Sequence, residues 1–452
     1  MNYTQAIEYL YARGHELETM NLGLSRILAL TEAAGAPQRL YPTVLIAGTN
    51  GKGSTAAMTF AIARAAGLRV GLYTSPHLVE ITERMRVADD EGARDISQAE
   101  FAHFATQVRV LGEQLLADGR LTSVPSLFEQ LTLLAFLYFA EKQIDLAVLE
   151  VGLGGRLDAT NVSAPVVTAI TPIDYDHQRH LGDTLPEIAG EKAGIIKPHT
   201  AVVVAPQRPE VMQIITARAA ELAAPVIAIE EKLREARLFQ VDKDVSTAAL
   251  ARPGACRLRY DSRHGSYDAR LSLRGGHQVL NALTALHIAE ALADAGFAIT
   301  AEHITQGLQQ AEWPGRLEWL TLPESKLPLL LDGAHNPAGA RVVRQFLTEF
   351  CPHRPVTMIF GAMTDKPFGE MEEILFPAAT RIIATKVNNP RAAEPRALAE
   401  RAAQMGFQAE PADSVRAALQ LARAVTPDHG LVCACGSLYL VGEIKGLPEL
   451  AC

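Results

Sequence analysis

A glycine-rich turn at residues 48–54 offers the clearest chemistry in the sequence. An apolar run at residues 44–47 breaks abruptly into the segment Gly48-Thr49-Asn50-Gly51-Lys52-Gly53-Ser54. Its glycines let consecutive backbone N–H groups close on an anion, and Lys52 adds a mobile positive charge. Residues 56–66 behind the turn are rich in good helix formers, and the N-terminus of a helix attracts phosphate. The stretch therefore predicts a strand, a phosphate-binding loop and a helix.

The spacing of this turn departs from the usual phosphate-loop pattern, G-x-x-x-x-G-K-[ST]. Gly48 precedes Gly51 by only three residues, and Gly53 separates Lys52 from Ser54. Taken alone, the turn is also compatible with a tight connection between a strand and a helix. Polar segments further along the chain favour nucleotide binding.

A carboxylate and a group of glycines follow a second apolar run. Residues 144–149 have the composition of a buried strand, and they lead directly into Glu150-Val151-Gly152-Leu153-Gly154-Gly155. Mg²⁺ prefers oxygen ligands, and it is commonly held by a carboxylate together with substrate phosphates. We therefore expect Glu150 to be a metal ligand. The alternative is a glutamate that caps the next helix.

Two more polar side chains follow predicted strands. Ser75 comes after the strand expected at residues 69–74, and His177 follows the strand expected at residues 166–170. Because the carboxyl ends of parallel strands meet at one edge of a sheet, both side chains can converge with Glu150 and the phosphate loop. Each also has a plainer interpretation, because a serine before proline is common in turns and a single histidine is usually an ordinary surface or core residue.

Two residues on predicted helices have plain interpretations from the residues alone. Lys192 lies in the segment Glu191-Lys192-Ala193-Gly194 and is expected to be a helix-surface cation paired with a nearby glutamate. Asn281 lies in a long helix that begins near Gly276. Its amide suits an adenine edge, but an asparagine inside a helix is more often structural.

The elements that position these residues indicate two α/β domains. The chain has 452 residues, of which 48% are hydrophobic, which is enough for more than one core. Helices are expected at 3–34, 97–117 and 124–142, a strand–helix–strand unit at 201–229 and short β-ribbons at 232–275. Near Trp313 a second alternating unit begins, with strands at 328–331, 356–360, 381–385 and 430–435. We place the domains at residues 1–311 and 312–452, with a cleft for two substrates between them.

The net charge and the cysteines indicate which partners to expect and in which compartment the protein acts. The net charge is -9 and no block of basic residues stands out, so we expect neither a nucleic-acid surface nor a membrane surface. The five cysteines show no C-x-x-C pair, which suits a reducing compartment. No apolar run reaches the length of a membrane span, and the first residues do not resemble a signal peptide. We expect a cytoplasmic protein that acts on small molecules.

Six segments, taken together, give the chain a resemblance to a known family. They are residues 48–54 (GTNGKGS), 74–77 (TSPH), 150–161 (EVGLGGRLDATN), 191–195 (EKAGI), 314–318 (PGRLE) and 332–336 (DGAHN). In this order they resemble the segments of folylpolyglutamate synthases/dihydrofolate synthases, which belong to the Mur ligase superfamily. The resemblance runs from about residue 5 to about residue 443. It implies a central domain like that of P-loop NTPases followed by a smaller Rossmann-like α/β domain, and the short phosphate loop is usual in that family.

The resemblance implies ATP and two Mg²⁺ ions as cofactors. It implies that ATP is bound by Thr49, Asn50, Gly51, Lys52, Gly53, Ser54, Asn281, Arg316 and Asp332. One Mg²⁺ would be held by Ser75 and Glu150, and the second by His177 with help from Glu150. Lys192 stands at the lysine that the family carbamylates, which would convert a cation into a carboxylate-like group near the second metal.

The resemblance also implies where the other substrates bind. The pterin substrate of bifunctional members would contact Asn21, Leu22, Gly23, Ser126, Leu127, Phe128, Leu157, Asp158 and Ala159. L-glutamate would bind near His335 and Ser437, and the catalytic set would be Lys52, Lys192 and His335. A match at residues 157–159 favours activity on both dihydropteroate and reduced folates. Family members usually act as monomers, and we expect the same here.

The implied reaction is an ATP-dependent amide ligation. A substrate carboxylate attacks the γ-phosphate of ATP to give an acyl phosphate and ADP, and the amine of L-glutamate then attacks the acyl carbon. Three alternatives stay open: a synthase that only extends folate glutamate tails, a Mur-type peptidoglycan ligase, and a nucleotide-binding regulator without catalysis. The peptidoglycan ligases usually carry an additional N-terminal domain, whereas this phosphate loop already begins at Gly48. The residues that argue against the regulator are Lys52, Glu150, His177, Lys192 and Asp332, which are all intact.

Overall fold

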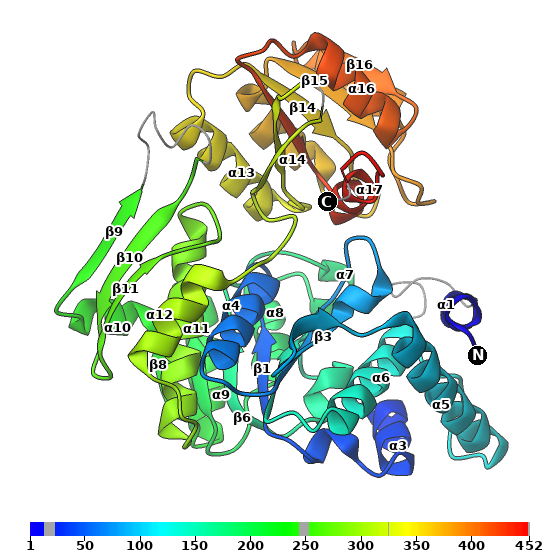
Figure 1. Ribbon diagram of the computed structural model, residues 1–452, viewed down its shortest axis with the longest axis vertical. Helices are drawn as coiled ribbons and strands as arrows, with labels where there is room; N and C mark the ends of the chain where they lie inside the picture. The colour runs from blue at the N-terminus through cyan, green and yellow to red at the C-terminus, as the bar shows by residue number, and fades with distance from the viewer. Residues whose placement is uncertain (13–22, 244–252, 324, 451–452) are drawn as a thin grey trace.

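An eight-stranded mixed sheet carries the glycine-rich turn at residues 48–54 at its centre (Figure 1). The computed structural model describes residues 1–12, 23–243, 253–323 and 325–450. The strand order is β4-β3-β2-β5-β1-β6-β7-β8. In chain order the strands are β1 (Thr43–Ala47), β2 (Val70–Tyr73), β3 (Met85–Asp89), β4 (Gly92–Asp95), β5 (Leu146–Glu150), β6 (Pro165–Ile170), β7 (Ala201–Val204) and β8 (Val226–Ala228).

Seven of these strands point in one direction, and only β3 runs the opposite way, because it pairs antiparallel with both β2 and β4 at one edge. The register pairs Ile46 with Glu150, and Ala47 with Ile170. The segments that leave β1, β5 and β6 at their carboxyl ends therefore begin at one edge of the sheet. The β3–β4 hairpin is an element that the sequence analysis does not predict.

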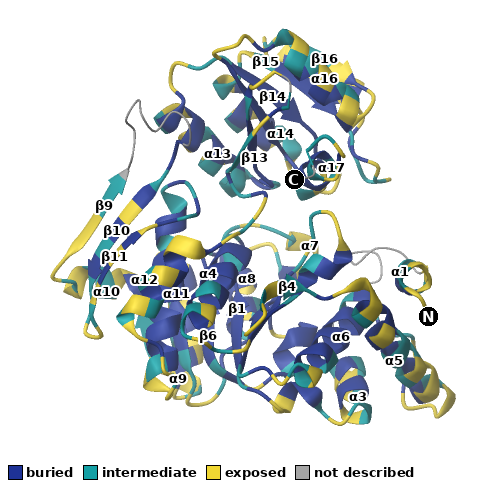
Figure 2. Ribbon diagram, in the orientation of Figure 1, coloured by how far each residue is buried: buried dark blue, intermediate teal, exposed yellow. Residues whose placement is uncertain are grey.

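Alternate residues of β1 enter two different cores, because both faces of the parallel sheet are covered. Leu45 and Ala47 join one core and Val44 and Ile46 join the other. The first core is closed by α1 (Tyr3–Tyr11), α3 (Ser25–Ala33), α5 (Gln98–Ala117), α6 (Leu127–Glu141), α8 (Leu185–Ala193) and α9 (Pro209–Glu221). The second is closed by α4 (Lys52–Ala65), α11 (His277–Asp294) and α12 (Ala301–Gln310). Figure 2 shows the buried sheet between these layers.

A small antiparallel sheet joins the second core. It consists of β9 (Phe239–Lys243), β10 (Cys256–Asp261) and β11 (Ser266–Arg270), in the order β11-β10-β9. Leu258, Tyr260 and Tyr267 are buried against the helices beneath it. The remaining helices of this part are the short α7 (Gln178–Leu181) and α10 (Ile229–Glu235). The predicted β-ribbons at 232–275 therefore correspond to α10 followed by this sheet.

A six-stranded sheet forms the upper lobe in Figure 1. Its order is β12-β13-β17-β14-β15-β16, and only β12 is antiparallel to its neighbour. The strands are β12 (Glu318–Thr321), β13 (Pro328–Leu331), β14 (Val356–Phe360), β15 (Arg381–Thr385), β16 (Ala409–Ala412) and β17 (Leu431–Cys435). One face is covered by α13 (Pro337–Phe350), α14 (Phe368–Leu375) and α15 (Pro395–Gln404), and the other by α16 (Val415–Val425) and α17 (Leu438–Lys445). The four predicted strands of this lobe are all present.

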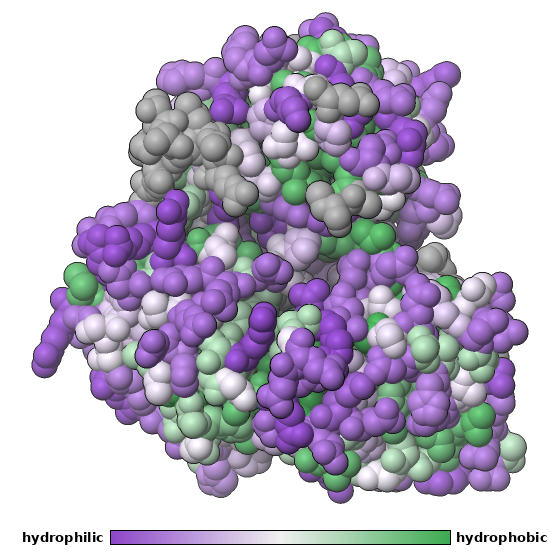
Figure 3. All heavy atoms as spheres, viewed as in Figure 1, coloured by the Kyte–Doolittle hydropathy of each residue, from purple (hydrophilic) through white to green (hydrophobic). Residues whose placement is uncertain are grey.

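The surface is hollowed between the two lobes (Figure 3). The four described cysteines, Cys256, Cys351, Cys433 and Cys435, are free thiols and buried. Cys452 lies outside the described residues. Within the described chain, no helix combines the length and the apolar character needed to cross a lipid bilayer.

Candidate active site

One cavity of about 550 Å³ lies between the two lobes and contains nearly every predicted site residue. Its walls include all of these residues that the structure describes, from Gly23 on the first domain to Ser437 on the second. Asn21 and Leu22 lie outside the described residues. The volume is typical of small-molecule sites, and segments more than 400 positions apart in the sequence meet around it.

The turn between β1 and α4 has a backbone that only glycine adopts readily. Gly48 and Gly51 have φ values of 148° and 90°, in the region that side chains disfavour. A Cβ atom on Gly48 would collide with the side chain of Thr171, and one on Gly53 would lie 2.7 Å from the ring of Trp313. The glycines therefore allow the close packing that brings the loop N–H groups to the cavity.

Two lysine side chains converge on one backbone oxygen of this loop. Lys52 Nζ donates to the carbonyls of Gly48 and Thr49 at 3.2 and 3.1 Å, and Lys192 Nζ donates to Gly48 O at 2.7 Å. Lys192 is only 4% exposed, so it is not a surface cation; the neighbouring Glu191 pairs with Arg156 instead. Burial, together with the charge of Lys52, lowers the pKa of Lys192 to about 7. A large fraction of Lys192 is therefore a neutral amine at neutral pH.

A buried amide network joins α11 to the phosphate loop. Gln278 Nε2 donates to Ser54 Oγ at 3.3 Å, and Asn281 Nδ2 donates to Gln278 Oε1 at 2.9 Å. Asn281 also packs against Gly51, whose missing side chain leaves room for the amide. Gln278 lines the cavity but was missed from the sequence. Its signal was available, since it lies three residues before Asn281 and so on the same face of the helix.

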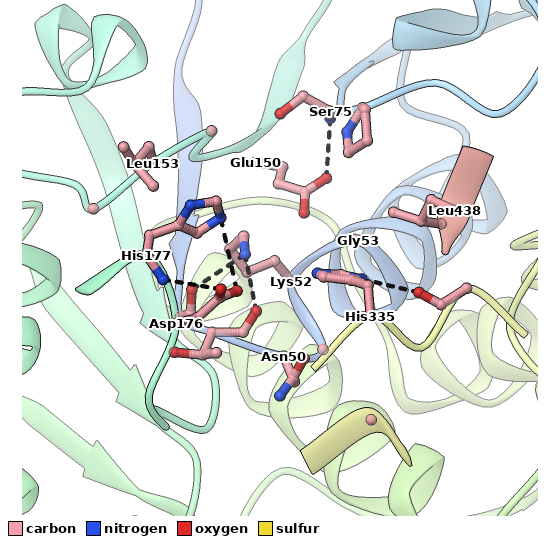
Figure 4. A pocket seen from close by; sticks show the side chains of 18 of the residues that line it. Asn50, Lys52, Gly53, Ser75, Glu150, Leu153, Asp176, His177, His335 and Leu438 are labelled. Carbon is pink, nitrogen blue, oxygen red and sulfur yellow. Dashed lines mark hydrogen bonds and ion pairs between the residues drawn. The ribbon is translucent and has the colours of Figure 1, made fainter. Parts of the chain in front are cut away.

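Glu150 ends β5 inside the cavity, where its carboxylate points toward Ser75 (Figure 4). Glu150 Oε2 accepts a hydrogen bond from the backbone N–H of Ser75 at 3.2 Å. Burial raises the pKa of Glu150, although the charges of Lys52, Arg316 and Arg84 oppose that rise. A buried carboxylate beside a hydroxyl is a site where a hard cation would relieve the cost of burying negative charge.

His177 lies on the other side of the cavity beside Asp176 (Figure 4). Its Nε2 is 3.7 Å from Asp176 Oδ2 and 3.4 Å from the ammonium nitrogen of Lys366, which belongs to the second domain. Burial lowers the pKa of His177 to about 3; Asp176 opposes this fall and Lys366 adds to it. The ring is therefore neutral at pH 7. Lys366 was not predicted to be a site residue from the sequence.

The wall contributed by the second domain is organised around Asp332, at the end of β13. Its carboxylate accepts from the backbone N–H groups of Leu317 and Ala334 at 2.9 and 2.8 Å. Leu317 has a φ of 45°, which is unusual for a residue with a branched side chain. Arg316 packs over Gly333, where a Cβ atom would lie 2.5 Å from its guanidinium. Asp332 thus holds the backbone directly after Arg316 and the segment at Gly333 against which Arg316 packs.

Two further residues of this wall were predicted from the sequence. His335 Nδ1 is 2.9 Å from the carbonyl of Gly333. Burial, with the charge of Lys366, lowers the pKa of His335 to about 4, so its ring is neutral at pH 7. Ser437 caps α17 by accepting from the N–H of Tyr439 at 3.1 Å. Both line the cavity at helix starts, where N–H groups and the helix dipole favour anionic ligands.

One part of the cavity wall on the first domain, around the start of α6, has mixed polarity. Phe128 and Ser126 come from the start of α6, where Ser126 and Glu129 form a reciprocal cap. The adjacent loop is held by Asp158, whose oxygens accept from the N–H groups of Gly152, Leu153 and Thr160 at 2.9–3.0 Å. Leu157 and Ala159 line the cavity on either side of it, as does Gly23.

The residues predicted to hold the first metal, Ser75 and Glu150, fit Mg²⁺ by their chemistry. Among the described residues, no cluster of three or more His, Cys, Asp or Glu side chains is arranged to hold a metal by itself. Mg²⁺ seldom uses such a cage and instead takes one or two carboxylates with phosphate oxygens and water. Glu150 and Ser75 beside the phosphate loop supply that donor set. The neutral imidazole of His177 has a nitrogen suited to a second cation, but Lys366 faces it in this arrangement.

Comparisons with known proteins are consistent with this geometry. Residues 46–289 match the Mur ligase middle domain, and residues 315–438 match the Mur ligase glutamate ligase domain. A dihydrofolate synthase/folylpolyglutamate synthase of Bacillus subtilis is 34% identical over 94% of each chain. A crystal structure of Mycobacterium tuberculosis folylpolyglutamate synthase complexed with ADP and AMPPCP has a TM-score of 0.86, with 32% identity over 99% of each chain. The structure of E. coli FolC in complex with DHPP and ADP has a TM-score of 0.81, with 28% identity over 98% of this chain and 97% of that one.

Proposed function

This chain belongs to the Mur ligase family, among the dihydrofolate synthases/folylpolyglutamate synthases, and is an ATP-dependent ligase; from this we propose that it joins L-glutamate to two acceptors. One acceptor is dihydropteroate, which gives dihydrofolate. The other is the glutamate tail of reduced folates. The observation that supports this proposal is the shared cavity, where the phosphate loop of one domain faces Arg316 and His335 of the other.

The proposed reaction has two steps. An oxygen of the acceptor carboxylate attacks the γ-phosphorus of ATP, the bond to the β–γ bridging oxygen breaks, and an acyl phosphate and ADP form. The amine of L-glutamate then attacks the acyl carbon, phosphate leaves, and the amine loses a proton as the amide forms. Because two anions must meet in the first step, the protein mainly supplies positioning and positive charge.

We assign ATP to the phosphate loop and the facing wall. The N–H groups of residues 49–54 and the ammonium of Lys52 would cradle the phosphates, and Arg316 would add charge from the second domain. Release of Lys52 from its two loop carbonyls frees its donors for phosphate oxygens. Asn281 would contact the adenine, and Asp332 would act by holding the backbone beside Arg316. The ADP and AMPPCP complexes of the relatives support nucleotide binding at such a site.

We assign Mg²⁺ to two positions. The first would be held by Ser75 and Glu150, and the second by His177, Glu150 and a carbamate on Lys192. Bound Mg²⁺ would neutralise phosphate charge and favour attack at phosphorus. The buried, largely neutral amine of Lys192 is the form that reacts with CO₂, which supports carbamylation at this residue. We therefore assign three catalytic residues. Lys52 would bind the phosphates, Lys192 would hold metal through its carbamate, and His335 would lie near the incoming amine.

The part of the cavity wall around the start of α6 is the proposed pterin site. Phe128 and Leu157 offer apolar surface, and Ser126 offers polar groups, as does the backbone around Ala159. Asp158 would act through the loop, because its carboxylate already accepts three backbone N–H groups. Gly23, Asn21 and Leu22 complete the assignment. L-glutamate is assigned to the wall formed by His335 and Ser437.

Phosphate release from ATP tests the function. The assay contains Mg²⁺ and L-glutamate with either 7,8-dihydropteroate or tetrahydrofolate as the acceptor. Release that depends on glutamate with both acceptors is expected. Release with tetrahydrofolate alone would leave an enzyme that only extends folate tails and would remove the pterin role from the residues near α6. Release with neither acceptor would favour a peptidoglycan-type ligase or a regulator.

Three organisational features stay predictions. We place the boundary between the domains at residues 311 and 312, and we expect a cytoplasmic protein that acts as a monomer. Limited proteolysis followed by mass spectrometry would locate the boundary. Light scattering during size-exclusion chromatography would give the oligomeric state.

A further inference from the structure

Lys366 projects into the cavity from a turn that is fixed within the second domain. The turn follows β14 and is tied to the segment before α15, because Thr364 N donates to Arg391 O at 2.9 Å. The guanidinium of Arg391 pairs with Asp365 at 3.3 Å, and Lys366 N donates to Met363 O at 3.1 Å. The backbone of Lys366 is therefore positioned by its own domain and not by the contact it makes across the cleft.

Across the cleft, Lys366 meets Asp176 and His177 together. Lys366 Nζ donates to Asp176 Oδ1 at 2.8 Å, and the two side chains are only 13% and 11% exposed. The same Asp176 oxygen accepts from the backbone N–H of His177 at 2.9 Å, which fixes the aspartate beside the ring. Three polar groups from two domains thus share one buried position.

The contact with His177 uses the nitrogen that a metal would need. Lys366 Nζ is 3.4 Å from His177 Nε2. An ammonium group has donors and no acceptor, so Nε2 must be the acceptor and carry its lone pair toward Lys366. A metal ion binds imidazole through that same lone pair. The ammonium and a divalent cation at His177 therefore exclude each other by geometry, and their charges also repel.

We propose that Lys366 competes with a divalent ion for the position beside His177 Nε2, and that it must withdraw before the ion can bind there. The inference rests on the proposed role of His177 as a metal ligand. Withdrawal also breaks the ion pair with Asp176, which joins the two domains. Loading of the second metal is thereby coupled to release of one contact between the domains.

Binding of Mn²⁺, used as a paramagnetic substitute for Mg²⁺, tests the inference without a turnover assay. Free Mn²⁺ is measured by electron paramagnetic resonance with the full-length protein, a non-hydrolysable ATP analogue and fixed bicarbonate. The variants are Lys366→Met and Lys366→Gln, the second of which keeps a polar side chain. The matched control is Lys386→Met, because Lys386 pairs with Glu394 at 3.0 Å on the same domain and does not line the cavity.

Both Lys366 variants are expected to bind the second Mn²⁺ at least about tenfold more tightly than the wild type and the control. Two Mn²⁺ ions bound with equal affinity by all four proteins would overturn the inference and leave the proposed function intact. Weaker second-site binding by the Lys366 variants would also overturn it, because Lys366 would then support the metal. One Mn²⁺ in every protein would remove the second metal from the proposed function, and the competition with it.

Discussion

The side-chain amides of Asn50 and Asn336 exchange hydrogen bonds across the cleft. Asn336 Nδ2 donates to Asn50 Oδ1 at 3.1 Å, and Asn50 Nδ2 approaches Asn336 Oδ1 at 3.5 Å. Asn50 belongs to the phosphate loop, whereas Asn336 also caps α13 by accepting from Gly339 N at 2.8 Å. One side chain thus connects the start of a helix in the second domain to the loop proposed to bind ATP.

The two roles of Asn336 can be separated by substitution. Serine still caps a helix but is too short to reach Asn50, whereas alanine loses both contacts. We expect Asn336→Ser to keep the wild-type stability and Asn336→Ala to lose about 1 kcal/mol in urea unfolding. Both variants should lose a similar part of the ligase activity, about tenfold, if the contact aligns the domains. Wild-type activity in Asn336→Ser would show that the contact has no part in turnover.

Lys52→Ala is expected to abolish detectable turnover while leaving the fold intact. The ammonium contacts only two carbonyls of its own loop among the hydrogen bonds described here, so its loss should hardly change the melting temperature. Removing one group that stabilises developing charge lowers rates by roughly 10²–10³-fold or more. Phosphate release measures the effect, with Lys386→Ala as the control for loss of a lysine elsewhere. Turnover of Lys52→Ala close to that of the wild type would contradict the assignment of residues 48–54 as a phosphate-binding loop.

Carbamylation of Lys192 should increase as the pH rises through about 7. The neutral amine attacks CO₂. Because the pKa of Lys192 is lowered to about 7 from the ordinary lysine value of 10.5, the neutral amine becomes populated as the pH rises through about 7. With ¹³C-bicarbonate, the carbamate signal in nuclear magnetic resonance should be weak at pH 6 and strong at pH 8. Lys192→Gln provides the blank, because it has no amine at this position. A signal that persists unchanged in Lys192→Gln would place the carbamate on another lysine.

Asp158→Ala should destabilise the protein by about 3 kcal/mol. Its two carboxylate oxygens accept three backbone N–H groups and the hydroxyl of Thr160, and alanine would leave these donors buried without acceptors. Asp158→Asn should cost less, because one carbonyl oxygen remains. Urea unfolding gives the free energies, and the KM for dihydropteroate reports whether the loop geometry matters for that acceptor. Equal stability of Asp158→Ala and the wild type would contradict the role given to this carboxylate.

The phosphate loop and the strand ends around it were predictable because their signals are local. Residues 44–54 change from apolar to glycine-rich within a few positions, and Glu150 follows an unbroken apolar run. Strand ends in a parallel sheet share one edge, so convergence followed from the order of elements. Among the described residues, every predicted site residue lines the cavity.

Contacts between segments that are distant in the sequence could not be predicted from local patterns. Nothing near Lys366 in the sequence shows that it faces Asp176, because the partners are 190 positions apart and belong to different sheets. Gln278 looked like any polar residue at a helix start until its amide was found beside Ser54. The β3–β4 hairpin was not predicted because residues 85–95 mix charged and apolar side chains without a clear alternation.

The carboxylate of Asp332 accepts hydrogen bonds from the backbone N–H of Leu317, the residue after Arg316, and from that of Ala334. The direction of the Arg316 side chain therefore depends on a residue sixteen positions later. Asp332 holds the backbone of Leu317 in the left-handed region, and Leu317 follows Arg316 directly. A substitution at Asp332 would therefore disturb the position of Arg316 while leaving the arginine itself unchanged.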